Sequence, residues 1–193
     1  MFIRQSNFKK LLKSAYDGAG LTVGRDEDGI LLSGGFWIIW LKESAMSKKA
    51  IASIIELTRD LPAKGEIFVS TEGGNQYEIP EIDRWGLPRK ADEADVPYKV
   101  TGVAVKYGRG YSRILQHPGT NDTKMISNSI TEMISIREMD TEVEEQPIGP
   151  VVREDNQTVV YWKNNVCILA ACLIDPQEYG EELLRLLQSL ELE

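Results

Sequence analysis

Chemistry that needs clustered histidines or cysteines has little support in this sequence. The 193 residues include one histidine and two cysteines, whereas a zinc site needs several ligands at short spacing. Cys167 and Cys172 are five positions apart in an apolar segment, so a strand would point them to opposite faces. We therefore expect two buried, reduced cysteines, no metal site and no cofactor.

Long hydrophobic runs are also missing. No segment approaches the roughly 20 apolar residues that a membrane helix requires, and Met1–Lys10 lacks the apolar core of a secretory signal. With 42% hydrophobic and 27% charged residues, the composition is that of an ordinary globular protein. These features predict a cytoplasmic protein without membrane association.

Catalytic signatures are absent as well: there is no P-loop, Rossmann fingerprint, HExxH or Gly-x-Ser-x-Gly motif. His117 lies in a turn-like sequence with Asp122 nearby, and a His-Asp pair can act as a general base and its orienting group. No serine or cysteine nucleophile motif accompanies this pair. The sequence favours a non-enzymatic protein, with a hydrolase or transferase using His117 as an alternative.

The negative charge is unevenly distributed along the chain. The net charge is -8, of which residues 1–97 carry -2 and residues 98–193 carry -6. Proteins that coat duplex DNA usually present a basic face, so general duplex binding is disfavoured. An acidic protein more readily suits a basic partner.

One sequence pattern is present twice. Leu21–Leu41 and Gly149–Leu173 both contain an entry strand, an acidic turn, a return strand and a very apolar strand, and Arg25 corresponds to Arg153. This pattern predicts an internally duplicated α+β fold of two pseudo-symmetric halves, with helices packed on mostly antiparallel sheet. The predicted parts are residues 1–80, a proline-containing connector over 81–97 without periodicity, and residues 98–193.

Apolar spacing predicts the main elements of both halves. Phe36–Lys42 is apolar on both faces, which indicates a central strand or one at an interface. The predicted terminal helix begins at Asp175, Pro176 and Glu178. Its predicted buried stripe comprises Tyr179, Leu183, Leu186, Leu187 and Leu190. Further helices are predicted from Ser6 to Gly18, from Ser47 to Asp60 with Ile51, Ile54, Ile55 and Thr58 inside, and from Asp122 to Ile134.

A predicted hairpin between residues 98 and 116 interleaves aromatic and basic side chains around a Gly-x-Gly turn. Aromatic rings can stack on bases and guanidinium groups can bind phosphate, so this hairpin is a candidate nucleic-acid site. The alternative is a solvated hairpin tip with tyrosines packed across the strands. The candidate residues are Lys106, Tyr107, Arg109, Tyr111 and Arg113.

Two further segments are candidate protein-binding sites. Asp140, Glu142, Glu144 and Glu145 form an acidic insert in the second copy, which would engage a basic partner or remain a solvated loop. Trp85 in the connector precedes a Gly-Leu-Pro step. It would anchor a partner's pocket or fold back onto the core.

The duplicated helix-plus-strands layout resembles the half-domains of sliding clamps, which implies association with nucleic acid. The small size and the absence of catalytic motifs resemble accessory proteins of bacteriophages, including anti-defence inhibitors. Lysines cluster only in the first two predicted helices, at Lys9, Lys10, Lys13, Lys48 and Lys49. We expect non-enzymatic binding of a macromolecule, with a protein partner preferred, nucleic acid as an alternative and a homo-oligomer compatible with the pattern.

Overall fold

The computed structural model describes residues 1–78, 86–108, 110–176 and 178–192. Its first part contains two helices and five strands that follow one another closely. In chain order these are α1 (Gln5–Asp17), β1 (Leu21–Arg25), β2 (Gly29–Ser33), β3 (Trp37–Lys42), α2 (Lys48–Thr58), β4 (Ile67–Thr71) and β5 (Gly74–Glu78), with a 3-10 turn at Glu43–Ala45.

The second part contains three helices and seven strands among the described residues. In chain order these are α3 (Leu87–Asp92), β6 (Val96–Pro97), β7 (Lys99–Tyr107), β8 (Gly110–Gln116), β9 (Thr123–Ser127), α4 (Asn128–Thr131), β10 (Ile148–Val152), β11 (Val159–Lys163), β12 (Cys167–Cys172) and α5 (Glu178–Gln188), with a 3-10 turn at Ile136–Glu138.

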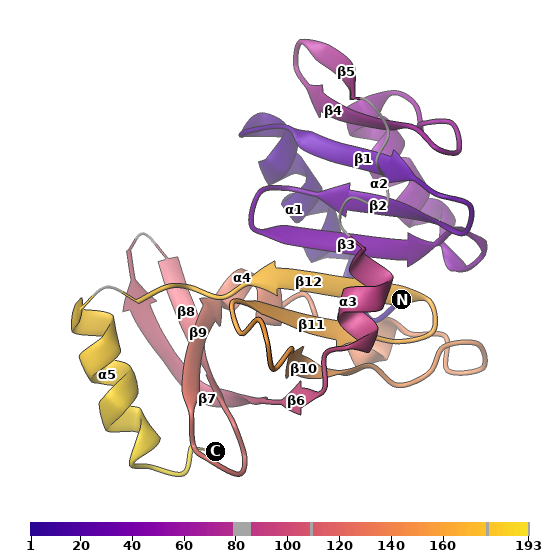
Figure 1. Cartoon of the computed structure of the whole chain (residues 1–193). Helices are drawn as coiled ribbons and strands as arrows, with labels where there is room; N and C mark the ends of the chain where they lie inside the picture. The colour runs from indigo at the N-terminus through magenta and orange to yellow at the C-terminus, as the bar shows by residue number, and fades with distance from the viewer. Residues whose placement is uncertain (79–85, 109, 177, 193) are drawn as a thin grey trace.

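The strands form two antiparallel sheets (Figure 1). The large sheet has nine strands in the order β5-β4-β1-β2-β3-β12-β11-β10-β6, and the small sheet has three in the order β7-β8-β9. The predicted α+β class with a largely antiparallel sheet is thereby confirmed.

The centre of the large sheet is the antiparallel pair of β3 and β12, in which Ile39 lies opposite Leu169. Both strands are apolar on both faces because both faces are covered. The predicted central position of the Phe36–Lys42 strand is confirmed. On one face Trp37, Ile39 and Leu41 are almost completely buried.

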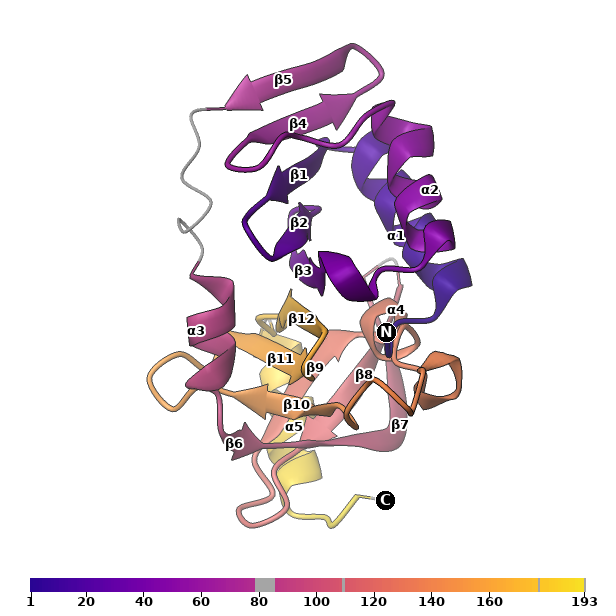
Figure 2. The same ribbon diagram turned by 90° about the vertical axis from the view of Figure 1, so that its right-hand side faces the viewer.

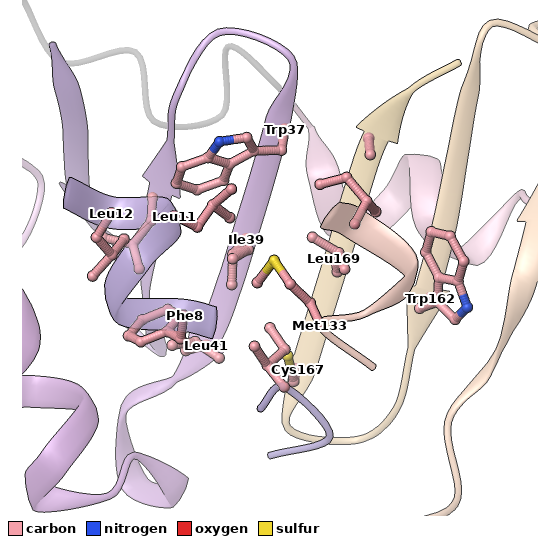
Figure 3. Close-up of a cluster of buried hydrophobic side chains, with 14 of the residues drawn as sticks. Phe8, Leu11, Leu12, Trp37, Ile39, Leu41, Met133, Trp162, Cys167 and Leu169 are labelled. Atoms are coloured by element: carbon pink, nitrogen blue, oxygen red, sulfur yellow. The ribbon is translucent and has the colours of Figure 1, made fainter. Parts of the chain in front are cut away.

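Helices cover the two faces of this sheet unequally. α1 and α2 pack side by side on one face, and α3 packs on the other near β11 and β12 (Figure 2). The main core cluster contains Phe8 and Leu11 of α1 together with Leu169 of β12, and Met133 lies between them (Figure 3). Side chains from both predicted halves therefore share one core, while the predicted boundaries between them stay a prediction.

Successive residues in the strands of the small sheet point to opposite faces, and each face is covered by a different hydrophobic core. Ile114 and Met125 point to the side on which α5 packs and contact the cluster that includes Leu184. Leu115 and Ile126, one residue further along each strand, belong to the main core instead.

The predicted helix from Asp122 to Ile134 is wrong. Thr123–Ser127 is strand β9, and only the four residues of α4 are helical in this segment. In the sequence the spacing of Met125 and Ile126 also fits a helix. In the structure these adjacent residues point to opposite sides of the small sheet, and each is buried in a different core. Pairing with β8 therefore outweighs the helical pattern.

The expectation that the segment 81–97 lacks periodic structure is wrong for its described residues after Gly86, which form helix α3 and strand β6. The place of this segment as a boundary between two halves stays a prediction. Pro88 lies in the first helical turn, where proline's missing N–H costs nothing. Leu87 and Ala91 are one helical turn apart, and both are buried against the large sheet.

Three finer expectations about side-chain placement also fail. Ile55 of α2 is 37% exposed, and the helix buries Ala50 and Ser53 instead. The exposed fractions of Leu186 in α5 and of Leu190 just beyond its end are 68% and 53%, although both belong to the predicted buried stripe. Cys167 is buried, as expected, but Cys172 is exposed.

The start of the first helix differs from the prediction by one residue. Helix α1 begins at Gln5 with Arg4 as its N-cap, and Ser6 lies inside it.

Candidate interaction surface on the helical layer

The outer surface of α1 and α2 is strongly basic. It carries five exposed lysines, which we call the lysine face: Lys9, Lys10 and Lys13 on α1, and Lys48 and Lys49 on α2. The two helices contain only two carboxylates, Asp17 and Glu56, so their net charge is +3. Since the whole chain has a net charge of -8, the residues outside these two helices carry a net charge of -11. The lysine face is a local cationic surface on an acidic protein.

Two lysines of this face are engaged in ion pairs and three are not. Lys9 Nζ lies 2.6 Å from Glu56 Oε2, which joins α1 to α2, and Lys13 Nζ lies 2.9 Å from Asp17 Oδ2. Lys10, Lys48 and Lys49 have no side-chain ion pair within the part of the chain that the structure describes. Three ammonium groups thus remain available to an incoming anion.

A shallow groove of about 600 Å³ runs between the two helices. Its walls include the stems of Lys9, Lys10, Lys13 and Lys49, and Ala52 also lines it. Lysine stems present apolar surface while their charged ends stay in water. The groove therefore offers a largely apolar interior, and its rim carries four lysines and the Glu56 carboxylate that pairs with Lys9.

An apolar pocket of about 400 Å³ adjoins the groove on the other side of α1. Leu11, Trp37 and Met133 line it, and Phe36 at its edge is 45% exposed. Lys10 lines both this pocket and the groove, so the two hollows share one residue on α1. Together they form a continuous candidate interaction surface.

A glycine permits the tight packing beside this pocket. A Cβ added to Gly34 would lie 2.6 Å from the Cβ of Ala15 on α1. Only glycine lets the β2–β3 turn approach α1 this closely. This close approach brings the neighbouring Phe36 next to the end of α1.

Sequence patterns contain part of the signal for this surface. The lysine clusters are visible, and Lys9 and Lys13 share one helical face because they are four positions apart. The pocket has no such local signal, since its walls come from α1, the β2–β3 turn and the segment after α4. Only the fold brings those residues together.

The structure brings together some of the predicted hairpin residues and separates others. Lys106 lies opposite Tyr111 across β7 and β8, and Arg113 points to the same face two residues further on. Arg113 already donates to Asn128 Oδ1 and to the carbonyl of Gly102, each at 3.1 Å. Its guanidinium is therefore partly committed within the chain.

Tyr107 lies on the opposite face of this hairpin. A Cβ added to Gly180 of α5 would come within 3.3 Å of its ring, so Tyr107 packs against that helix. Arg109 and Trp85, the other two predicted binding residues, lie outside the described residues. The described hairpin therefore presents Lys106 and Tyr111, without the full predicted set.

The acidic insert divides in a similar way. Asp140, Glu142 and Glu145 are exposed, whereas Glu144 is 9% exposed. The Glu144 carboxylate pairs with the ammonium group of Met1 through Oε1. Three of the four predicted carboxylates face solvent, and the fourth holds the N-terminal segment before α1 against the core.

His117 and Asp122 are not linked through their side chains. His117 Nδ1 accepts hydrogen bonds from the backbone amides of Gly119 and Thr120, each at 3.0 Å. The Asp122 carboxylate instead accepts from the Tyr98 hydroxyl at 2.5 Å. Burial and this hydrogen bond raise the pKa of Tyr98 above its ordinary value. These contacts stabilise a turn and its neighbouring strand.

Comparisons with protein-family models, with curated proteins and with solved structures found no match to this chain. Within the described ranges, no three His, Cys, Asp or Glu side chains are grouped closely enough to hold a metal ion. No helix among the described residues combines the length and apolar character needed to cross a membrane.

Proposed function

We propose that this protein acts by binding another macromolecule, without catalysis, and that the lysine face and the apolar pocket receive an acidic segment of a protein partner. The observation that carries the proposal is the segregation of charge: +3 on two neighbouring helices, against -11 on the rest of the chain. Such a patch attracts an anionic partner and orients it during the encounter.

The apolar pocket supplies what charge alone does not. Interfaces draw most of their binding free energy from a few large side chains buried in pockets, with charged groups at the rim. The pocket beside Phe36 and Trp37 has the size for one such anchor, and Lys10 at its edge is free to pair with a carboxylate. We expect an acidic segment that contains at least one aromatic or aliphatic anchor.

A protein partner fits this surface better than a nucleic acid. Proteins that bind single strands stack successive bases on several aromatic rings, and Phe36 is the one exposed aromatic of this surface among the described residues. A long polyanion would also extend beyond the lysine face toward the acidic remainder of the molecule. A short acidic segment avoids that repulsion.

Such binding suits a small accessory protein that acts by contact alone. An inhibitor of the bacteriophage type would need only a surface that occupies its target. No residue of this surface is required to perform a reaction.

We also propose that β1–β3 and β10–β12 arose by internal duplication. In the large sheet the two triplets are arranged in mirror order around the β3–β12 pair. The guanidinium of Arg25 donates bidentate hydrogen bonds to the Glu43 carboxylate, and that of Arg153 donates bidentate hydrogen bonds to the Asp155 carboxylate. Superposing the two triplets with Arg25 on Arg153 tests the idea, since backbones that diverge in that register would contradict it.

The direct test of the binding function uses the protein as bait. Immobilised wild type, the variant Lys10→Glu with Lys49→Glu, and the control variant Lys106→Glu are each incubated with native-host lysate. Bound proteins are eluted with salt and quantified by mass spectrometry. We expect acidic proteins that wild type and the Lys106 variant retain, and that the double variant retains roughly tenfold less.

Two results would contradict this function. Equal retention of every protein by the wild type and the double variant would remove the lysine face as a binding site. Alternatively, a fluorescent single-stranded oligonucleotide that binds wild type at low salt, and binds the double variant much less, would assign the face to nucleic acid.

A further inference from the structure

Helix α5 and the turn that follows it carry apolar side chains that the fold leaves uncovered. Leu184 and Leu187 contact the core cluster beneath the small sheet. On the outer side, Leu186 of α5 is 68% exposed, and Leu190, two residues beyond the end of the helix, is 53% exposed. Large side chains repeated at helical spacing are typical of a buried helix face. An exposed stripe of this kind marks an interaction site.

Carboxylates accompany the stripe. Helix α5 contains Glu178, Glu181 and Glu182 against the single cation Arg185, a net charge of -2. Arg185 is paired with Glu181 at 3.5 Å, whereas Glu182 is exposed and has no ion-pair partner among the described residues. The surface of α5 is thus apolar and acidic at once, which is the partner chemistry that the lysine face requires.

The two surfaces cannot meet within one molecule. α5 packs beside the small sheet at one end of the protein, and α1 and α2 cover the other end of the large sheet in both views (Figures 1 and 2). A contact between them must therefore join two molecules.

We propose that the partner received by the lysine face is α5 of a second copy of this chain. In this contact α5 lies along the groove between α1 and α2, Leu186 and Leu190 meet its apolar lining and the adjoining pocket, and Lys10 and Lys49 face the carboxylates of α5. This is the helix-in-groove mode of recognition, with charge complementarity at the rim. The inference rests on the proposed binding function and identifies its partner.

The contact is head-to-tail. Each copy offers one helix and one groove, so the interface is heterologous, and further copies add in the same way until a ring closes or a filament grows. Removing either surface from a molecule should leave the other surface functional.

Sedimentation velocity over a concentration series tests the association. We expect the wild type to sediment faster as its concentration rises, and to return to a monomer at about 1 M salt, where charges are screened. The variants Leu186→Ser with Leu190→Ser, and Lys10→Glu with Lys49→Glu, should need roughly tenfold higher concentration to associate. Val143→Ser, which changes an exposed apolar residue elsewhere, should behave as wild type.

A mixture of the two double variants provides the second measurement. The lysine variant keeps a functional α5, and the leucine variant keeps a functional groove. At a concentration at which the wild type associates, each variant alone should remain monomeric, and the mixture should form a one-to-one complex and nothing larger. Circular dichroism melts of both variants confirm that they fold.

A wild type that stays monomeric at every concentration overturns the second-copy inference. So does a mixture of the folded variants that forms no complex. Neither result contradicts the proposed binding function, which is tested separately by the retention of host proteins and by the oligonucleotide measurement described above.

Discussion

At the scale of single residues, Glu144 has the most sharply defined role. Its carboxylate pairs with the Met1 ammonium group, and the side chains are 6% and 10% exposed. The pair also joins Phe2 and Ile3, both fully buried, to the segment that precedes β10. Removing one member leaves an unpaired buried charge, which costs far more than losing an exposed ion pair.

We predict that Glu144→Gln lowers the free energy of unfolding by about 3 kcal/mol. Glu145→Gln is the matched control, because Glu145 is exposed, and it should change stability by less than about 0.5 kcal/mol. Urea unfolding followed by circular dichroism measures both. Equal stability of the two variants would show that the Met1–Glu144 pair does not form.

Arg25 and Glu43 make stability depend on pH. The guanidinium hydrogen bonds of Arg25, at 3.0 and 2.6 Å, lower the pKa of Glu43 from its ordinary value of 4.5. A lowered folded-state pKa contributes stability that is fully present above pH 4.5 and is lost as the pH falls through the folded pKa.

We therefore predict that Glu43→Gln lowers the melting temperature at pH 7, and that its difference from wild type shrinks progressively below pH 4.5. Exposed Glu27→Gln, on the adjacent turn, should show no such trend. Thermal melts across the acid range measure the difference. A difference that grows with acidity would have the wrong sign for this pair.

At the scale of elements, the orientation of α5 decides which leucines are structural. Leu184 is 9% exposed and packs with Ile114 and Met125, whereas Leu186 is 68% exposed. We predict that Leu184→Ala lowers the unfolding free energy by about 2 kcal/mol or more. Leu186→Ala should change it by less than about 0.5 kcal/mol.

Chemical unfolding of the Leu184→Ala and Leu186→Ala variants shows which face of α5 packs against the small sheet. If Leu186→Ala were the more destabilising of the two, Leu186 would be the leucine that packs against the core. That result would also remove the exposed surface on which the second-copy inference depends.

Elements with local signals were predictable from sequence. The β1–β2 turn forms because Asp26 Oδ1 accepts from the amides of Asp28 and Gly29, at 2.8 and 2.6 Å, and this is ordinary turn chemistry. The N-cap of α2 is equally local, since the Ser47 side chain accepts from the Ala50 amide.

Elements with apolar residues on more than one face were not predictable, because the sequence does not show which neighbouring element covers each face. Helical spacing of Met125, Ile126 and Ile130 suggested one helix, but pairing with β8 converts most of that segment into strand β9. In α5 both the inner and the outer leucines fit a helical stripe. Only the position of the small sheet decides which of them is covered.

At the scale of the whole molecule, two surfaces of opposite charge lie at opposite ends. The lysine face and its apolar pocket lie on α1 and α2, and the acidic surface with exposed leucines lies on and just after α5. The lysine clusters of α1 and α2 could be read from the sequence, but their juxtaposition with each other and with the Phe36 pocket could not. The juxtaposition of the two helices depends on contacts such as Lys9–Glu56, which are 47 positions apart. The pocket depends on residues still farther apart in the sequence, such as Lys10 and Met133. We therefore predict that the two ends meet between molecules.

Zero-length cross-linking of lysines to carboxylates tests this claim most directly, in an equal mixture of ordinary and nitrogen-15-labelled protein. Lys9 and Glu56, 2.6 Å apart within one chain, supply the internal positive control. We predict additional links from Lys10 or Lys49 to Glu182 that join labelled to unlabelled chains. Recovery of the Lys9–Glu56 link without any such mixed link would contradict it.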